Sequence, residues 1–178
     1  MSNPIKSAAA TTSPNFVIER TYRASVDELW DLWTTKEGFQ SWWPPEGFRT
    51  KVHVIEACPN GRLHYENIAE TPETAAVMKE LGLPVSHVER ARFSEFRPRE
   101  RLVLSITIDF LAGVEPYEST TIVDFFPSGQ WTRMVVTLFP MHDAEFTKMA
   151  RAGLESQFRN RDKRFQSWNE QPGCGDGI

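Results

Sequence analysis

The chain has 178 residues, of which 40% are hydrophobic and 12% aromatic, and its formal net charge is −4. This length and composition predict one packed globular domain and exclude a largely disordered chain. The slightly acidic balance argues against a nucleic-acid-binding protein, because phosphate backbones are bound by positively charged surfaces.

The positions of the cysteines and the hydropathy pattern indicate the cellular location of the protein. Cys58 and Cys174 lie far apart in the chain, so we expect neither a disulfide framework nor a zinc site. Residues 1–15 contain no apolar stretch long enough for a signal peptide, and no later segment approaches the length of a membrane span. The sequence therefore predicts a cytoplasmic protein that does not associate with membranes.

Both ends of the chain are predicted to be flexible tails around a single domain. Residues 1–14 are rich in Ser, Thr, Ala and Pro, and residues 169–178 contain three glycines and a proline. The domain is expected to occupy residues 15–168.

A strand followed by two short helices opens the domain. Alternating apolar residues predict the strand over Phe16–Tyr22. Ser25 and Glu28 have the spacing of a capping box directly before an apolar run, which predicts the start of the first helix. The second helix is expected over Lys36–Trp43, because two prolines follow it.

Further strands are predicted where apolar residues alternate between turn signals. They cover Phe48–Ala57, Arg62–Asn67, Val88–Phe96, Leu102–Phe110, Tyr117–Phe126 and Trp131–Phe139. Most of the connections are short turns, for example around Pro59-Asn60-Gly61, so neighbouring strands are expected to pair antiparallel.

Two more helices are predicted. Residues 71–83 form a helical insertion between strands, with Thr71 as its cap, Pro72 at its first position and Gly82 at its end. This insertion is either a lid over a site or a cover for a sheet edge. A long helix from about Asp143 to Trp168 closes the domain.

Several short segments carry a resemblance to a known family. They are Phe16–Trp33, Gln40–Pro44, the turn at Asn60-Gly61, Val114–Glu118, Arg133–Thr137 and Met141–Asp143. With the order of elements, they make the chain similar to the helix-grip fold of the START-like (SRPBCC) superfamily. Within it, the chain resembles bacterial relatives of the activator of heat-shock protein 90 ATPase, also described as polyketide-cyclase-like.

The resemblance implies an α+β helix-grip fold, in which a curved antiparallel sheet of six to seven strands surrounds the long C-terminal helix. It also implies a cavity for a small, largely apolar, lipid- or polyketide-like molecule, without a cofactor. The eukaryotic co-chaperone has a separate N-terminal domain that engages the chaperone. Because only a short tail precedes the first strand here, we expect the fold to carry over without that activity.

The long helix contains a glycine where the cavity is expected. Gly153 costs about 1 kcal/mol relative to alanine inside a helix, so it calls for a reason. It either leaves room for a ligand or permits close contact between helix and sheet. With Gly153, the residues expected to contact an apolar ligand are Trp43, Ile106 and Phe146.

The polar end of the site is expected on the hairpin that follows Ile106. If its loop is centred near Gly113-Val114, Asp109 lies opposite Glu118, and two like charges need an offsetting group such as Arg90 or Arg92. The pair is then a clamp for a ligand headgroup, a general acid/base pair or a structural ion-pair network. We place Asp109, Tyr117, Glu118 and Arg92 among the ligand-binding residues.

Three functions remain open from the sequence alone. The first is binding of a small apolar molecule, and the second is a cyclase- or aromatase-type enzyme with Asp109 or Glu118 as its base. The third is an interaction protein, a chaperone partner or a homodimer that uses the outer face of the sheet. The four histidines lack metal-ligand spacing, so no metal site is predicted.

Overall fold

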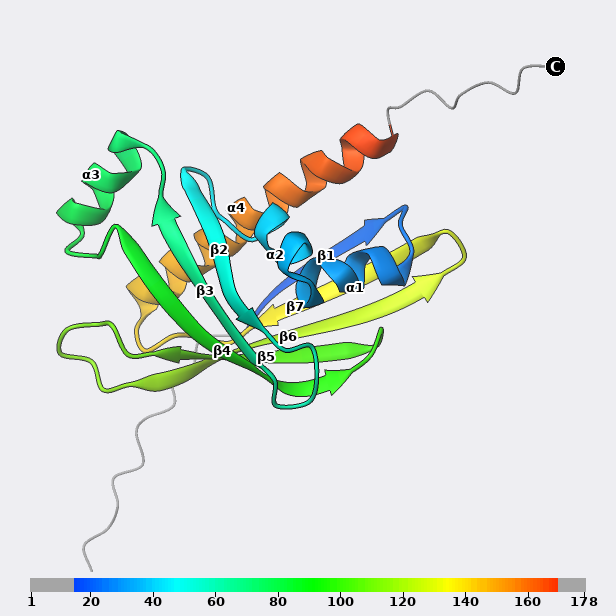
Figure 1. The fold of residues 1–178 in the computed structure, drawn as a ribbon, viewed down its shortest axis with the longest axis horizontal. Coiled ribbons are helices and arrows are strands. Elements are labelled where there is room, and N and C mark those ends of the chain that lie inside the picture. The colour runs from blue at the N-terminus through cyan, green and yellow to red at the C-terminus, as the bar shows by residue number, and fades with distance from the viewer. Residues whose placement is uncertain (1–14, 170–178) are drawn as a thin grey trace, which may run out of the picture.

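The computed structural model describes residues 15–169, which form one curled antiparallel sheet and four helices (Figure 1). The strands are β1 (Phe16–Tyr22), β2 (Phe48–Ile55), β3 (Arg62–Ala69), β4 (Ser86–Arg97), β5 (Arg101–Ile108), β6 (Tyr117–Ser128) and β7 (Trp131–Leu138). The helices are α1 (Val26–Thr34), α2 (Lys36–Trp42), α3 (Pro72–Glu80) and α4 (Ala144–Asn169). The expected α+β class and long final helix are confirmed, and the strand number is seven.

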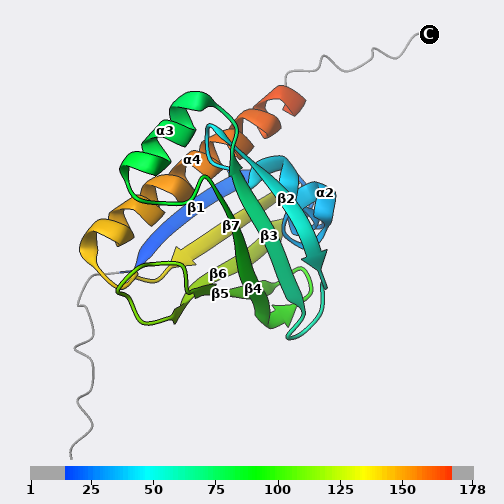
Figure 2. The same ribbon diagram turned by 60° about the vertical axis from the view of Figure 1, so that its left-hand side comes forward.

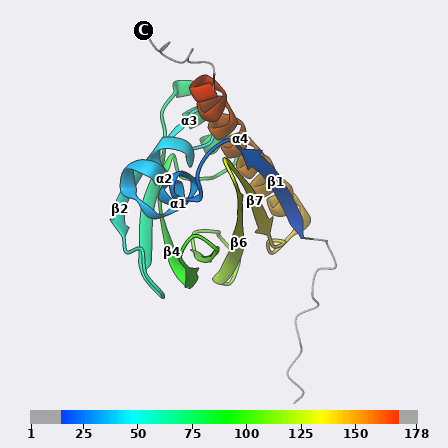
Figure 3. The same cartoon turned by 90° about the vertical axis from the view of Figure 1, so that its right-hand side faces the viewer.

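The sheet has the strand order β1-β7-β6-β5-β4-β3-β2, and every neighbouring pair is antiparallel. The first strand therefore pairs with the last. The sheet curls strongly, α1 and α2 lie within the curl at one end, and α4 runs along it (Figure 3). This arrangement is the helix-grip architecture that the order of elements predicts.

Local capping chemistry sets the starts of α1 and α2. The Ser25 hydroxyl accepts a hydrogen bond from the backbone N–H of Glu28, and the Glu28 carboxylate accepts one from the Ser25 backbone N–H at 2.7 Å. Thr35 caps α2 by accepting from the Gly38 N–H at 3.0 Å. Such caps satisfy backbone donors that lack a partner within the helix. Helix α2 ends at Trp42, one residue before the predicted end.

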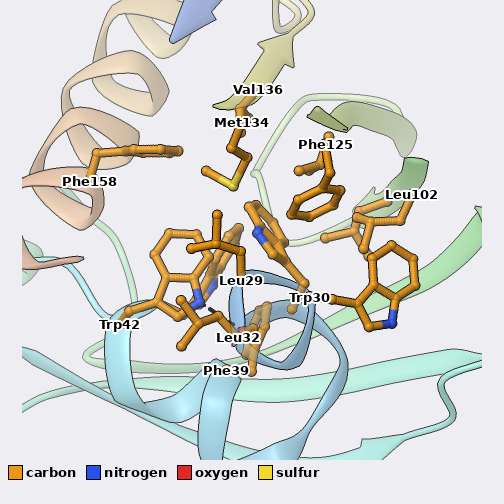
Figure 4. Close-up of a cluster of buried hydrophobic side chains, with 14 of the residues drawn as sticks. Leu29, Trp30, Leu32, Phe39, Trp42, Leu102, Phe125, Met134, Val136 and Phe158 are labelled. Atoms are coloured by element: carbon orange, nitrogen blue, oxygen red, sulfur yellow. Dashed lines mark hydrogen bonds between the residues drawn. The ribbon is translucent and has the colours of Figure 1, made fainter. Parts of the chain in front are cut away.

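The apolar faces of α1 and α2 build the core (Figure 4). The cluster combines Leu29, Trp30, Leu32, Phe39 and Trp42 of these helices with Leu102, Phe125, Met134 and Val136 of the sheet and Phe158 of α4. The Trp42 indole N–H donates to the Leu32 carbonyl at 2.8 Å, so its polar atom is satisfied inside the core. Complete burial of one leucine or phenylalanine contributes roughly 1.5–3 kcal/mol, so this cluster is a main source of stability.

The insertion forms α3 beside α4 at one end of the molecule (Figure 2). Thr71 caps it and Pro72 begins it, as predicted, and Gly82 follows with a φ of 68°, a left-handed conformation that favours glycine. None of the α3 residues is buried. The predicted tails, residues 1–14 and most of residues 169–178, lie outside the described residues.

One register differs from the expectation. Strand β5 ends at Ile108, two residues before the predicted end, and Glu118 pairs with Thr107 rather than with Asp109. A shift of two residues leaves every side chain on its original face, so the hydrophobic alternation does not distinguish the two registers. The longer connection over residues 109–116 decides the register, and the predicted Asp109–Glu118 pair is wrong.

Candidate ligand-binding site

A cavity of about 220 Å³ lies between α4 and the inner face of the sheet. Its walls are Trp43, Tyr65, Asn67, Glu89, Ile106, Ile108, Phe110, Ser119, Thr121, Leu138, Met141, Phe146, Ala150, Gly153, Leu154 and Gln157. Most of this lining is apolar or aromatic, with a few polar groups among it, which is the usual character of a small-molecule site. Four predicted contact residues, Trp43, Ile106, Phe146 and Gly153, are among the lining residues.

A second cavity of about 210 Å³ adjoins the first beneath α3. The two share the lining residues Asn67, Glu89, Phe110 and Phe146. The second also reaches Met78 of α3, so the insertion covers this part of the site. The position of α3 fits the predicted lid, and the lid role itself stays a prediction.

Gly153 faces open space rather than a neighbouring strand. A Cβ built at this position meets no heavy atom within 4 Å. Close contact between α4 and the sheet therefore does not explain the glycine. Of the two reasons considered for Gly153, the geometry favours room in the cavity, because a side chain here would project into that space.

Glu89 is the ionisable carboxyl group of the cavity. It lies on β4 directly opposite Tyr65 of β3, and its side chain is 16% exposed. Its Oε2 atom has no hydrogen-bond partner among the described residues. Burial, reinforced by the negative charge of Asp109, raises the pKa of Glu89 from 4.5 to about 7. Both protonation states are therefore populated at neutral pH.

The groups around Glu89 provide no strong counter-charge. The His87 Nε2 atom lies 4.0 Å from Glu89 Oε2, which is too far for a hydrogen bond, and the imidazole ring packs 4.1 Å from the Phe110 ring. Burial lowers the pKa of His87, so its neutral form is favoured. Burial and the Glu89 charge hold the pKa of Tyr65 well above its usual range.

The predicted polar clamp lies outside the cavity as two separate ion pairs. Arg90 contacts Asp109 at 2.9 Å, and Arg92 contacts Glu118 at 3.0 Å. The arginines offset the two carboxylates as expected, but on the outer face of the sheet, because these side chains alternate with the inward-facing ones. Arg92, Asp109 and Glu118 are absent from the described lining of both cavities.

Tyr117 also lies outside the lining, next to one wall of the cavity. Its hydroxyl is 2.9 Å from Nδ1 of His142, and the His142 ring lies 4.9 Å from the ring of Phe146. Asp143 caps α4 by accepting from the Phe146 backbone N–H at 2.7 Å. Tyr117 thus belongs to a network that fixes the start of α4 and the position of Phe146.

Reasoning from the sequence missed Glu89, although a signal was present. His87, Glu89, Ala91 and Phe93 are two residues apart along β4 and therefore share one face. Ala91 and Phe93 are buried, so their apolar character marks that face as the inner one. A carboxylate in phase with them is predicted to point into the core.

The described residues contain no group of three histidine, cysteine, aspartate or glutamate side chains that could hold a metal ion. Between residues 15 and 169, no helix is long and apolar enough to cross a lipid bilayer. Glu89 is the one carboxyl residue among the described residues that line the two cavities.

The fold and the position of the cavity define a helix-grip domain of the START-like class. The family model described as activator of Hsp90 ATPase homolog 1-like protein matches residues 23–166. The chain belongs to this family. A comparison with curated proteins gives no match.

Solved structures support the same fold. A protein from Chromobacterium violaceum has a TM-score of 0.65 at 18% identity, over 85% of this chain and 96% of that chain. A protein from Staphylococcus epidermidis has a TM-score of 0.65 at 15% identity, over 93% and 98%. The AHSA1 protein from Silicibacter pomeroyi has a TM-score of 0.65 at 14% identity, over 85% and 96%. At these identities the similarity establishes the fold.

Proposed function

We propose that this protein binds a small, largely apolar molecule between the sheet and α4. The observation that carries the proposal is the cavity beside Gly153, where the middle of a long helix faces open space. Protein interiors are otherwise close-packed, and an empty apolar volume forfeits dispersion contacts. A bound ligand would restore them.

The lining supports a ligand with an apolar body and one polar group. Trp43, Phe110 and Phe146 offer aromatic surface, and Glu89 offers a single carboxyl group whose Oε2 atom is not engaged by the described residues. Polar groups placed in this way orient a ligand within an apolar pocket. In this proposal Glu89 takes the orienting role that the sequence suggested for Asp109 and Tyr117.

Titration with the neutral naphthalene dye Prodan tests the proposal, because its fluorescence reports transfer into an apolar site. The decisive variant is Gly153→Leu, which fills the cavity from α4. Its matched control is Ala152→Leu, the same side chain on the exposed side of the same helix. We expect saturable binding by the wild type and the control, and at least about tenfold weaker binding by Gly153→Leu, a loss of roughly 1.4 kcal/mol.

Equal binding by all three proteins would place the dye elsewhere and contradict the proposal. A circular dichroism spectrum of each variant separates loss of the site from loss of the fold. If the wild type binds no dye, native mass spectrometry of the protein from its own host provides an independent test, and a ligand-free mass together with no dye binding would overturn the proposal.

Proton-transfer catalysis is a second candidate, and the pKa of about 7 for Glu89 favours it. A general acid or base is most effective when its pKa lies near the working pH. We expect the protein to accelerate exchange of the α-protons of a small cyclic ketone, 2-indanone, in deuterated water. Loss of this exchange in Glu89→Gln but not in Glu118→Gln would support the candidate, and equal rates in all three proteins would exclude it for this substrate.

The proposal also locates the protein in the cytoplasm. The described free thiol, Cys58, is exposed, and an exposed thiol is suited to a reducing compartment. Fractionation of the host cells, with immunodetection of this protein, would test the location.

A further inference from the structure

We propose that the ligand of this cavity is a small apolar amine, bound as its ammonium ion with the Glu89 carboxylate as counter-ion. This inference rests on the proposed binding function and specifies the chemical class of the ligand. Three properties of the site support it: the sign of the charge in the lining, the position of the carboxyl group and the aromatic rings around it.

The charge of the lining favours a cation. None of the described residues that line the two cavities is a lysine or an arginine. The nearest guanidinium groups on β4, those of Arg90 and Arg92, are paired with Asp109 and Glu118 on the outer face. A carboxylate ligand, such as a fatty acid, would therefore meet Glu89 without a compensating positive charge. Like charges in a poorly solvated site repel strongly.

The position of Glu89 suits direct contact with a ligand. Glu89 lines both cavities, so this residue lies where they adjoin. Its Oε2 atom has no hydrogen-bond partner among the described residues, although the side chain is 16% exposed. An ammonium group supplies three N–H donors and a full positive charge, the complement of this carboxyl group.

Aromatic rings complete the complement to an organic cation. Trp43, Tyr65, Phe110 and Phe146 all line the first cavity. The faces of such rings attract cations, and the attraction is greatest where water is excluded. A small amine with an aromatic or aliphatic body would thus place its charge at Glu89 and its carbon skeleton against apolar surface. A neutral alcohol of the same size would make the apolar contacts but would lack the charge interaction with Glu89.

The ionisation of the site makes a distinctive prediction for such a ligand. The titratable groups that face Glu89 are His87 on the same strand, Tyr65 on β3 and Asp109 beyond β5, while α4 and α3 contribute the non-titrating Gln157 and Met78. Burial and Asp109 keep part of the Glu89 population protonated at neutral pH. An ammonium ligand selects the carboxylate, so its binding releases a proton and strengthens as the pH rises from 6 to 8.

Isothermal titration calorimetry with three probes of similar size tests the inference. The probes are 2-phenylethylamine, 2-phenylethanol and phenylacetate, titrated at pH 6 and pH 8 in two buffers that differ in ionisation enthalpy. At pH 8 we expect the amine to bind at least about tenfold more tightly than the alcohol, as for a hydrogen bond to a charged group. Phenylacetate should bind most weakly, and proton release should accompany the amine alone.

Two variants assign the preference to one group. Glu89→Gln keeps the shape of the side chain and should abolish both the amine preference and the proton release, while Glu118→Gln removes an exposed carboxylate and should change neither. Prodan binding by Glu89→Gln shows that its cavity is intact. Equal affinities for amine and alcohol, or a preference for phenylacetate, would overturn the amine inference while leaving the binding function standing. If neither Prodan nor any probe binds and the native mass of the protein from its host is ligand-free, the proposed function itself fails.

Discussion

Glu89 combines two properties that rarely occur together in a side chain with a purely structural role. It is mostly withdrawn from water, and one of its oxygens has no hydrogen-bond partner among the described residues. Burial of an unpaired charge is unfavourable, so the carboxyl group responds by holding its proton to higher pH. The free energy of unfolding should therefore depend on the protonation of this one residue.

The sign of this dependence follows from the two pKa values. The folded-state pKa of about 7 exceeds the ordinary value of 4.5, so the folded protein binds the proton more tightly than the unfolded chain. The contribution of Glu89 to stability is fully present below pH 4.5 and is lost as the pH rises through 7. The shift corresponds to roughly 3 kcal/mol. We expect urea unfolding of the wild type to lose about this much relative to Glu89→Gln between pH 4.5 and pH 8.

His87 acts in the opposite direction, because burial lowers its pKa and its stabilising contribution is lost on acidification. It is present in both proteins, so the difference between wild type and Glu89→Gln isolates the carboxyl group. A difference that stays constant across this pH range would show that Glu89 ionises as it does in the unfolded chain.

For single residues, the sequence predicts those cavity positions that belong to a recognisable apolar face. Trp43, Ile106, Phe146 and Gly153 could be expected at the cavity because the order of elements brings their faces together. Glu89 can be distinguished from Asp109 and Glu118 only by comparing it with its neighbours at two-residue spacing, because the buried Ala91 and Phe93 show which face of β4 points inward. The raised pKa of Glu89 depends further on tertiary burial, which no local pattern contains.

The helices differ in how many of their residues are buried. Helix α1 buries five residues, whereas α3 buries none and is defined mainly by its Thr71 cap, which accepts from the Thr74 N–H at 3.1 Å. Local openings are least costly where few apolar contacts are lost. A helix of this kind can open over a cavity while the sheet stays intact.

Amide hydrogen exchange tests this difference. We expect α3 amides to exchange at least about a hundredfold faster than those of α1, because their opening free energy is lower. Thr71→Ala removes the cap at a cost of about 1 kcal/mol and should accelerate α3 exchange about fivefold without affecting α1. Saturation with Prodan should slow α3 exchange if α3 is a lid. Protection of α3 equal to that of α1 would exclude that role.

Element starts and ends were predictable wherever a local motif determines them. The capping box at Ser25 and the Thr71-Pro72 start both involve residues within one helical turn, and both appear in the structure. The β5–β6 register was not predictable in this way. It depends on a loop whose length only the paired strands reveal, since the alternation is unchanged by a shift of two residues.

Across the whole molecule, α4 has two different halves. Its first half, with Phe146, Ala150 and Gly153, covers the cavity. Its second half is fixed to the sheet and to α2, where Phe158 packs against Trp42 and the guanidinium of Arg161 is buried against both rings. The helix therefore joins a part that faces the cavity to a part that packs in the core.

One hydrogen bond at the fixed end allows the two parts to be tested separately. The Tyr22 hydroxyl of β1 donates to Asp162 Oδ1 at 2.6 Å, and burial raises the pKa of Tyr22 to about 12, so the phenol keeps its proton. Tyr22→Phe removes this bond and should lower the free energy of unfolding by about 1–3 kcal/mol, measured by urea denaturation. Prodan affinity should stay unchanged, because Tyr22 does not line either cavity.

Arg20 supplies the control, since it contacts the same Asp162 at 3.3 Å with an exposed side chain. Arg20→Gln should cost less than about 1 kcal/mol, as is usual for an exposed ion pair. If Tyr22→Phe weakened dye binding as strongly as Gly153→Leu does, the fixed end of α4 would control the cavity. Helix α4 would then transmit a change at its fixed end to the cavity. Independent effects would instead show that the contacts that anchor α4 and the proposed binding site beside Gly153 depend on separate parts of one helix.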